Sequence, residues 1–165
     1  MEILSLDLTD LIEQCRAALL DSDPHVIAYA DMTELRNNFL PTDLISLPIN
    51  IYALWTRAQD ANWTLKYIGQ RSRKNGWRRV SEHLFWKHPK TQSKLDHVLQ
   101  ALLAGEELGV TAILVEPDSL RLAIEAELIN LSSRAEAGLP WNIQGKVPGK
   151  GPNNSFKPKP LRGSA

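Results

Sequence analysis

The chain has 165 residues, 43% of them hydrophobic, and its 19 Lys and Arg balance its 19 Asp and Glu, so the formal net charge is zero. Its size suits one buried core, and we expect a single domain with extensions. No apolar run is long enough to cross a bilayer and the first residues lack the basic start of a secretory signal, which predicts a cytoplasmic protein with no membrane association. The lone Cys15 excludes an internal disulfide and a zinc site of the usual kind.

The neutral total hides an uneven distribution of charge. Residues 1–48, here called the acidic leader, hold nine acids and two cations and carry a net charge of −7, whereas residues 49–165 carry +7. A basic module suggests a polyanionic partner, because Lys and Arg that neutralise phosphates dominate nucleic-acid affinity. The alternative is that one half simply solvates the other, and charge alone does not choose between them.

The acidic leader begins with an amphipathic pattern. Residues 4–20 place apolar side chains at helical spacing, and Asp23-Pro24 ends this predicted helix. A short apolar piece over 25–29 and a possible helix over 31–39 follow, before Pro41 and Pro48. We expect the leader to pack on or beside the module that follows.

From residue 49 the pattern changes to β-branched and aromatic residues. Residues 49–56 and 65–69 predict an antiparallel hairpin, 79–86 have helical potential, 94–108 predict a helix, 110–115 a strand, and the segment from Pro117 to Leu131 a second strong helix. This order predicts an α+β fold with a small three-stranded antiparallel sheet, made of the hairpin and one later strand and flanked by helices. The domain organisation predicted is a mainly helical leader over 1–48, a module over 49–146 and a mobile basic tail rich in Pro and Gly over 147–165.

A cationic run, KYIGQRSRKNGWRRVSEHL, spans residues 66–84. Within it, the residues that fit a loop binding a nucleic-acid backbone are Arg71, Arg73, Lys74, Trp77 and Arg78. Cations anchor phosphates and an indole can stack on a base. Trp77 has the alternative role of a core anchor.

Five short motifs follow one another in a recognisable order. They are Asn50-Ile51-Tyr52, Tyr67-Ile68-Gly69, Arg79 with His83 four residues later, Glu125 in EAELI, and Pro140-Trp141-Asn142. Over about 49–146 this series resembles the GIY-YIG nuclease superfamily, and the GWRR step and the Pro-Trp-Asn ending are most similar to its type II restriction endonuclease branch. Asn50 replaces the first glycine of the family name, which we expect to matter little, and the interval from Glu125 to Asn142 is long for the family.

The resemblance implies a GIY-YIG-like fold and a catalytic set. It implies that Tyr52 activates the attacking water, that Tyr67 and His83 support it by hydrogen bonding, and that Asn142 braces the site. The residue types agree with phosphodiester hydrolysis: a phenol can relay a proton, Arg79 can clamp the phosphate, and Glu125 can hold one Mg²⁺ or Mn²⁺. The commoner role of a strand tyrosine, packing in the hairpin, is the alternative for both phenols.

Glu125 has support from helical geometry. On a helix it falls between two apolar stripes, so its carboxylate should be half-buried, and a buried charge is costly unless a metal or partner compensates it. The alternative is an exposed pair of Arg121 and Glu125, four residues apart. Glu127 is the competing candidate for the metal.

These residues predict a Mg²⁺-dependent endonuclease that hydrolyses phosphodiester bonds in DNA, with RNA as an alternative substrate. A restriction-type or other defence or mobile-element nuclease fits best, and a homodimer would let one site per copy cut both strands. The alternatives are a non-catalytic nucleic-acid-binding or assembly module on the same scaffold, and an antibacterial nuclease toxin.

Overall fold

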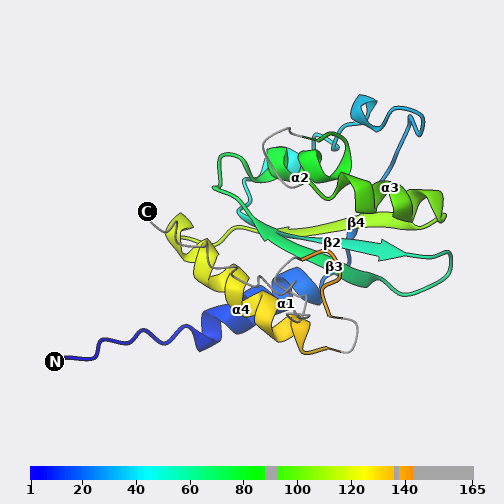
Figure 1. Ribbon diagram of the computed structural model, residues 1–165. Coiled ribbons are helices and arrows are strands. Elements are labelled where there is room, and N and C mark those ends of the chain that lie inside the picture. The colour runs from blue at the N-terminus through cyan, green and yellow to red at the C-terminus, as the bar shows by residue number, and fades with distance from the viewer. Residues whose placement is uncertain (88–92, 136–137, 143–165) are drawn as a thin grey trace, which may run out of the picture.

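The computed structural model of this chain describes residues 1–87, 93–135 and 138–142 (Figure 1). The predicted basic tail over 147–165 and the end of the predicted module, 143–146, lie outside the described residues. Within the described part, no helix combines the length and the apolar character needed to span a membrane.

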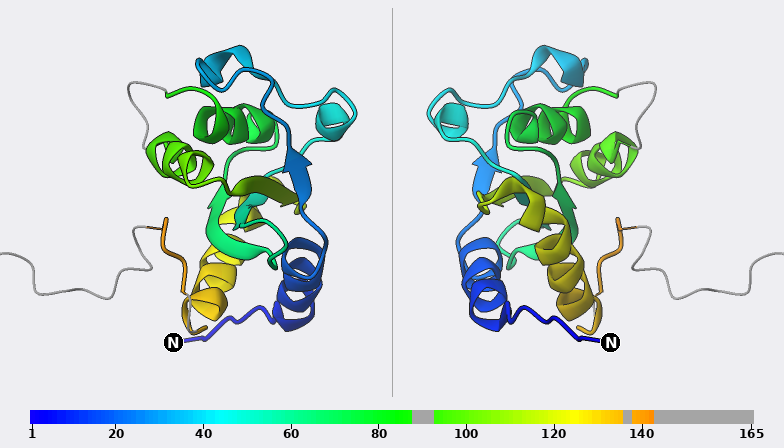
Figure 2. Two further views of the ribbon diagram at one scale, coloured as in Figure 1. Left: turned by 90° about the vertical axis from the view of Figure 1, so that its right-hand side faces the viewer. Right: turned by 90° about the vertical axis from the view of Figure 1, so that its left-hand side faces the viewer.

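The centre of the molecule is a four-stranded antiparallel sheet. Its strands are β1 (His25–Ile27), β2 (Ile51–Arg57), β3 (Thr64–Gln70) and β4 (Glu107–Ile113), in the spatial order β1-β4-β2-β3. Helices α2 (Gly76–Leu84) and α3 (Leu95–Leu103) cover one face, and α1 (Thr9–Leu20) and α4 (Arg121–Ser133) cover the other, as Figures 1 and 2 show. Three short 3₁₀ turns complete the described elements: η1 (Leu35–Asn37), η2 (Leu44–Ser46) and η3 (Asp118–Leu120). The predicted α+β class is confirmed, whereas the prediction of three strands is wrong.

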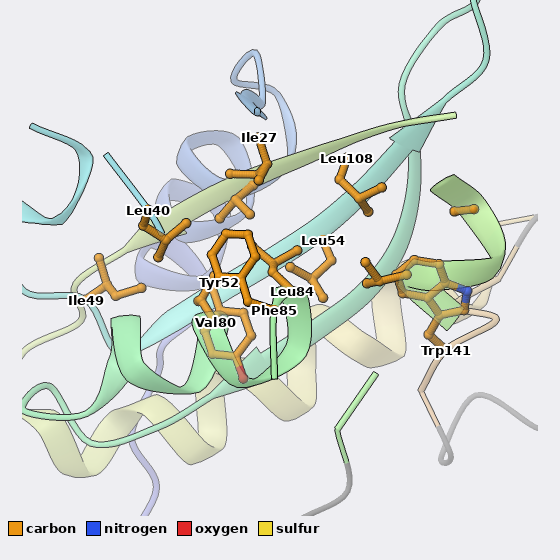
Figure 3. Close-up of a cluster of buried hydrophobic side chains, with 13 residues drawn as sticks. Ile27, Leu40, Ile49, Tyr52, Leu54, Val80, Leu84, Phe85, Leu108 and Trp141 are labelled. Carbon is orange, nitrogen blue, oxygen red and sulfur yellow. The ribbon is translucent and has the colours of Figure 1, made fainter. Parts of the chain in front are cut away.

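The two faces of β2 pack into two separate cores. Tyr52 and Leu54 point into a core shared with α2 and α3, here called the α2-side core, where the ring of Tyr52 lies among aliphatic side chains with its hydroxyl at the edge of the cluster (Figure 3). Ile51, Ala53 and Trp55 point into the α4-side core, shared with α1 and α4. Burial on both faces explains why this strand is almost continuously apolar.

The fourth strand comes from the acidic leader. Residues His25–Ile27 pair with Val110, Gly109 and Leu108 of β4, and Ile27 is buried in the α2-side core. Three residues are too short to show a strand period, so the sequence marked this segment only as apolar. The leader therefore supplies an edge strand to the sheet, and α1 adds the buried Cys15 and Leu19 to the α4-side core.

The helix predicted over 31–39 is wrong. Only the turn η1 forms, and the residues on either side of it, Glu34 and Asn38, have extended backbone. The Asn38 carboxamide donates to the Asp31 and Leu35 carbonyls, which in a helix would accept from N–H groups four residues later, and it accepts from the Ala30 and Asp31 N–H groups. The Asp31 carboxylate accepts from the N–H groups of Thr33 and Glu34, as at the start of a helix, but the helical turn ends at Asn37.

Other boundaries shift by a few residues. The first helix begins at Thr9 rather than near residue 4, after the Asp7 carboxylate accepts from the Thr9 N–H. The helix predicted over 94–108 ends at Leu103, and the following strand starts earlier than predicted, at Glu107. The last predicted helix begins with η3 and runs as α4 to Ser133.

The open edge of β3 is covered by the end of the described chain. After α4 the chain turns at Gly138, which has a φ of 55°, and returns along β3. There the Trp141 N–H donates to the Lys66 carbonyl at 3.0 Å, while the Asn142 side chain accepts from the Ile68 N–H at 3.0 Å and donates to the Ile68 carbonyl at 2.8 Å. Asn142 thus pairs with the strand as a neighbouring peptide group would.

Candidate active site

Two tyrosines and a histidine meet above the sheet on the α2 side. The Tyr52 hydroxyl lies 3.0 Å from Nε2 of His83, and both side chains are fully buried. The Tyr67 ring is 6.2 Å from that of Tyr52 and 5.1 Å from that of His83, measured between centroids. The spacing of the sequence motifs therefore corresponds to a real cluster.

The hydrogen bonds of His83 fix its tautomer. Nδ1 accepts from the backbone N–H of Lys94 at 3.0 Å, so the proton of the neutral ring sits on Nε2 and is donated to the Tyr52 oxygen. Burial, together with the charges of Arg79 and Lys94, holds the pKa of His83 well below its ordinary value. His83 is therefore a neutral hydrogen-bond donor that orients Tyr52.

Gly69 makes room for both phenols. It pairs with Tyr52 across β2 and β3, and a Cβ at this position would lie 2.8 Å from each tyrosine hydroxyl and 2.5 Å from Cε1 of Tyr67. The two hydroxyls therefore converge over the Cα of this residue. The sequence motif contained Gly69, but its role depends on a cross-strand partner that only the register reveals.

Arg79 joins this cluster from α2. Its charge lowers the pKa of both phenols and of His83, so the guanidinium lies close to all three groups. Its Nη1 donates to the Glu82 carboxylate at 2.7 Å, and both side chains are largely buried. Sequence reasoning missed Glu82; the signal was its position three residues after Arg79, on the same side of the helix.

Glu125 belongs to α4, which packs against β3, and its charge acts on both phenols. Its charge raises the pKa of both Tyr52 and Tyr67, while burial raises the pKa of its own carboxyl to about 7. The Glu125 side chain is half-buried, as its place between two apolar stripes of the helix predicted. Leu122, which belongs to one of those stripes, is nevertheless exposed. Arg121 is ion-paired with Asp118 at 2.6 Å, and the competing Glu127 is exposed.

Burial dominates the acid–base state of the phenols. It raises the pKa of Tyr52 and of Tyr67, and the opposing effect of Arg79 is smaller. Arg79 therefore lowers the pKa of each phenol without reversing the net increase. Tyr52 is fully buried and Tyr67 half-buried, and the hydrogen bond between them raises the pKa of Tyr52 and lowers that of Tyr67, so Tyr67 is the easier of the two to ionise.

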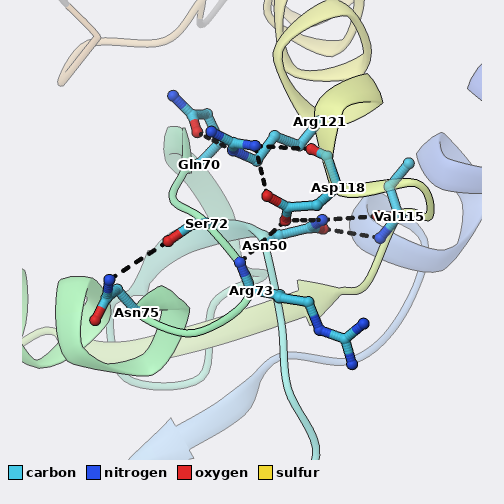
Figure 4. A network of polar contacts seen from close by, with 8 residues as sticks. All are labelled: Asn50, Gln70, Ser72, Arg73, Asn75, Val115, Asp118 and Arg121. Atoms are coloured by element: carbon cyan, nitrogen blue, oxygen red, sulfur yellow. Dashed lines mark hydrogen bonds and ion pairs between the residues drawn. The ribbon is translucent and has the colours of Figure 1, made fainter.

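The two asparagines of the motifs act on the backbone. Asn142 holds β3 at Ile68, between Tyr67 and Gly69, and does not itself reach the phenols in its hydrogen bonds. Asn50 is fully buried and pairs with both backbone groups of Val115 at 2.7 and 2.8 Å, as Figure 4 shows. Asn50 has a structural role that the sequence did not indicate, because it ties the start of β2 to the segment that leads into α4.

The cationic run forms the connection between β3 and α2 and the start of α2. Arg71 and Lys74 are exposed, Arg73 is ion-paired with Glu116 at 2.9 Å, and Arg78 lies 3.6 Å from Glu82. Trp77 donates its indole N–H to the Leu47 carbonyl at 2.7 Å and packs on the α2-side core. The structure favours the core-anchor alternative for Trp77.

Lys94 is a further side chain that sequence reasoning missed. It is buried, and its ammonium lies 5.2 Å from the centroid of the Tyr67 ring. An ammonium over the face of an aromatic ring is attracted by the ring's negative face and so helps to hold the Tyr67 ring in place. Nothing in the local sequence indicates this contact, since Lys94 lies 27 residues from Tyr67.

A divalent cation fits the donor set of this site. Among the described residues, no three His, Cys, Asp or Glu side chains gather as a metal-binding group. Glu125 is nevertheless a half-buried carboxylate whose raised pKa reflects an uncompensated charge. Mg²⁺ commonly binds one or two carboxylates and retains waters and substrate phosphates, so one acid is sufficient.

Comparisons of this chain with known protein families, with curated proteins and with solved structures found no match.

Proposed function

We propose that the chain is a Mg²⁺-dependent endonuclease of the GIY-YIG type that hydrolyses phosphodiester bonds in DNA. The observation that supports this is that the two phenol hydroxyls converge over Gly69, while the charges of Arg79 and of the half-buried Glu125 both act on these phenols. These groups come from β2, β3, α2 and α4, and a cluster drawn from four elements is not a by-product of one amphipathic helix. Catalysis of this kind needs a proton acceptor and charges that stabilise the developing phosphorane.

Each residue has a defined task in this proposal. Tyr67 accepts the proton of the attacking water in its ionised form and becomes neutral, and we assign this task to Tyr67 because burial and hydrogen bonding oppose its ionisation less than that of Tyr52. Tyr52, fixed by His83, donates to Tyr67 and stabilises its phenolate before the proton is transferred. Arg79 stabilises the phosphate, held in place by Glu82.

Glu125 is the residue that would hold the metal. A bound Mg²⁺ would supply positive charge for the phosphate oxygens and lower the pKa of the nearby water and phenol. It would also compensate the buried carboxylate.

The proposal is tested with supercoiled plasmid, purified protein, and either Mg²⁺ or a chelator. We expect nicking only with Mg²⁺, and a loss of about 100-fold or more in Tyr67→Phe and Glu125→Gln. The matched controls are Tyr29→Phe, whose hydroxyl donates to the Leu84 carbonyl in the α2-side core, and Glu127→Gln, exposed on the same helix as Glu125. Nicking that survives the chelator, or that is equal in both site variants and both controls, would contradict the proposal.

A non-catalytic nucleic-acid-binding module is the second candidate. It is favoured by the ion pair of Arg79 with Glu82, which occupies one guanidinium amino group, and by the raised pKa of both phenols. DNA binding without nicking under Mg²⁺ or Mn²⁺ would support the module and reject the enzyme. Sequencing of the product ends, if the plasmid is cut, distinguishes a restriction-type dimer from a nuclease without sequence preference.

A further inference from the structure

The guanidinium of Arg121 is held in one place by two neighbours. Its Nε donates to Oε1 of Gln70 at 2.9 Å, and its Nη1 donates to the Asp118 carbonyl at 2.8 Å and to Oδ2 of Asp118 at 2.6 Å (Figure 4). Within the described residues, the hydrogen bonds of Arg121 use Nε and Nη1, and none involves Nη2. Two of the three guanidinium nitrogens are therefore held in place, and the amino group Nη2 remains for a ligand.

Asp118 is itself anchored from two other elements. Its Oδ1 accepts from Nδ2 of Asn50 and from the backbone N–H of Arg73, each at 3.0 Å. The Arg73 side chain points away from this network (Figure 4) toward Glu116. Arg121 is thus connected to the buried start of β2 and to the backbone of the cationic run.

Arg121 lies at the border of the candidate active site. It stands one helical turn before Glu125 on α4, and its charge lowers the pKa of the Glu125 carboxyl. Its partner Gln70 follows Gly69, over which the two phenols converge. The Arg121 side chain is 21% exposed, so solvent and ligands can reach it.

We propose that Arg121 binds a backbone phosphate adjacent to the scissile one. This inference rests on the proposed function, since it takes nucleic acid as the substrate. A guanidinium that is already ordered loses little side-chain entropy when it binds, and its remaining amino group, Nη2, can donate to a phosphate oxygen. A phosphate bound there would lie one helical turn from Glu125.

The alternative is that Arg121 and Asp118 form only a structural ion pair. A variant of each residue distinguishes this alternative from phosphate binding. Arg121→Gln and Asp118→Asn both break the ion pair, but only Arg121→Gln removes a phosphate ligand. We measure the affinity of each full-length variant for a short labelled DNA duplex over a range of salt concentrations, in chelator so that no cleavage occurs. We expect Arg121→Gln to weaken binding about tenfold and to reduce the slope of log affinity against log salt by about one. Asp118→Asn should weaken binding much less than Arg121→Gln, because it loosens the guanidinium but also removes a negative charge beside the proposed phosphate.

Variants of a second ion pair, distant from the candidate site, show how much the loss of any one charge changes DNA affinity. Arg57 and Glu107, 2.7 Å apart, lie at the opposite end of β2 from Tyr52. Arg57→Gln should change the affinity and the salt slope less than Arg121→Gln does, and Glu107→Gln provides the counterpart of Asp118→Asn. Arg121→Lys, with the charge retained, should weaken binding but keep the salt slope. Arg121→Ala replaces Arg121→Gln in the comparison if thermal unfolding shows that the Gln variant is not folded.

The inference would be overturned if Arg121→Gln and Asp118→Asn weakened DNA binding equally. It would also be overturned if Arg121→Gln weakened binding no more than Arg57→Gln does, or if the wild type did not bind the duplex. The plasmid assay decides cleavage separately. A chain that cuts DNA and is indifferent to Arg121→Gln contradicts only this inference, and a chain that binds through Arg121 without cutting contradicts only the nuclease.

Discussion

Gly69 is the residue that most directly controls the position of both phenols. A methyl group there would lie 2.5 Å from Tyr67 Cε1 and 2.8 Å from both hydroxyls, closer than side chains pack. We expect Gly69→Ala to reduce stability by about 1–3 kcal/mol because the rings must move, and to abolish any nicking activity. Urea unfolding and the plasmid assay measure the two effects.

A double variant tests whether Tyr67 is the cause of that cost. Tyr67→Ala removes the closest atom, so Gly69→Ala should cost less in the Tyr67→Ala background than in the wild type. Additive losses of stability would show that the methyl group is accommodated without contact with the ring.

The buried carboxylate of Glu125 makes stability depend on pH. Its pKa is about 7 in the folded chain and 4.5 ordinarily, so the folded state binds the proton more tightly than the unfolded state. Stability therefore falls as pH rises from about 4.5 to about 7 and is constant beyond. Without divalent cations, Glu125→Gln should gain about 1–2 kcal/mol relative to wild type between pH 5 and pH 8, after allowance for solvent screening.

Thermal unfolding at several pH values checks this expectation. Glu127→Gln, exposed on the same helix, should follow the wild-type curve. Parallel curves for wild type and Glu125→Gln would mean that the carboxylate is solvated in the folded chain. Added Mg²⁺ should raise the melting temperature of the wild type more than that of Glu125→Gln.

The spacing of residues in the sequence predicted the members of the candidate active site better than the side chains that contact them. Tyr52, Tyr67 and Gly69 followed from two strands, and Arg79 and His83 from one helix turn. Glu82, Lys94 and Asn50 were missed or undervalued because their contacts depend on tertiary packing and not on local pattern.

At the scale of elements, Asn142 satisfies the backbone hydrogen bonds of Ile68 on the outer edge of β3. Its carboxamide donates to the Ile68 carbonyl and accepts from the Ile68 N–H, and it is 6% exposed. Asn142→Asp replaces the donor with a charged acceptor facing a carbonyl, which should cost about 2 kcal/mol or more and loosen the strand that carries Tyr67. Hydrogen exchange at the Ile68 amide and chemical unfolding measure this.

Asn130→Asp is the matched change at an exposed position of α4 and should be close to neutral. If Asn142→Asp were equally neutral, the pairing with Ile68 would contribute nothing to the edge. The long interval between Glu125 and Asn142 is explained by the path of the chain, which completes α4 and turns at Gly138 before it reaches β3.

Long elements with a clear hydrophobic pattern were predicted well, and elements of three residues were not. Within the described residues, both strands of the hairpin and the four α-helices correspond to predicted segments, with shifted ends. β1 was missed because its three residues acquire strand character only by pairing with β4. The helix over 31–39 failed because Asn38 offers the backbone an alternative set of hydrogen bonds.

At the scale of the whole molecule, the acidic leader is part of the folded unit. Leu19, Ile27 and Leu40 are buried in the two cores, and β1 forms one edge of the sheet. Deleting residues 1–48 removes enough buried surface to exceed the usual 5–15 kcal/mol of net stability. We expect that truncated chain to lose cooperative unfolding in calorimetry and circular dichroism.

Deleting only residues 1–6 is the control, because these residues are exposed and the deletion keeps Asp7, whose carboxylate accepts from the Thr9 N–H at the start of α1. It should leave the melting temperature unchanged. A cooperative transition in the chain that lacks 1–48 would mean that the leader is dispensable for folding. The leader's own cations are already engaged, Arg16 with Glu13 and Asp21 and Arg36 with Glu34.

The candidate residues come from both helix layers: Tyr52 and Tyr67 pack in the α2-side core, Arg79 belongs to α2, and Glu125 belongs to α4 in the other layer. Their relative positions therefore depend on how both layers pack on β2 and β3. If the proposed activity is present, the loss of a single methylene from either layer should shift these positions slightly, so the nicking rate should reveal packing defects too small to unfold the chain.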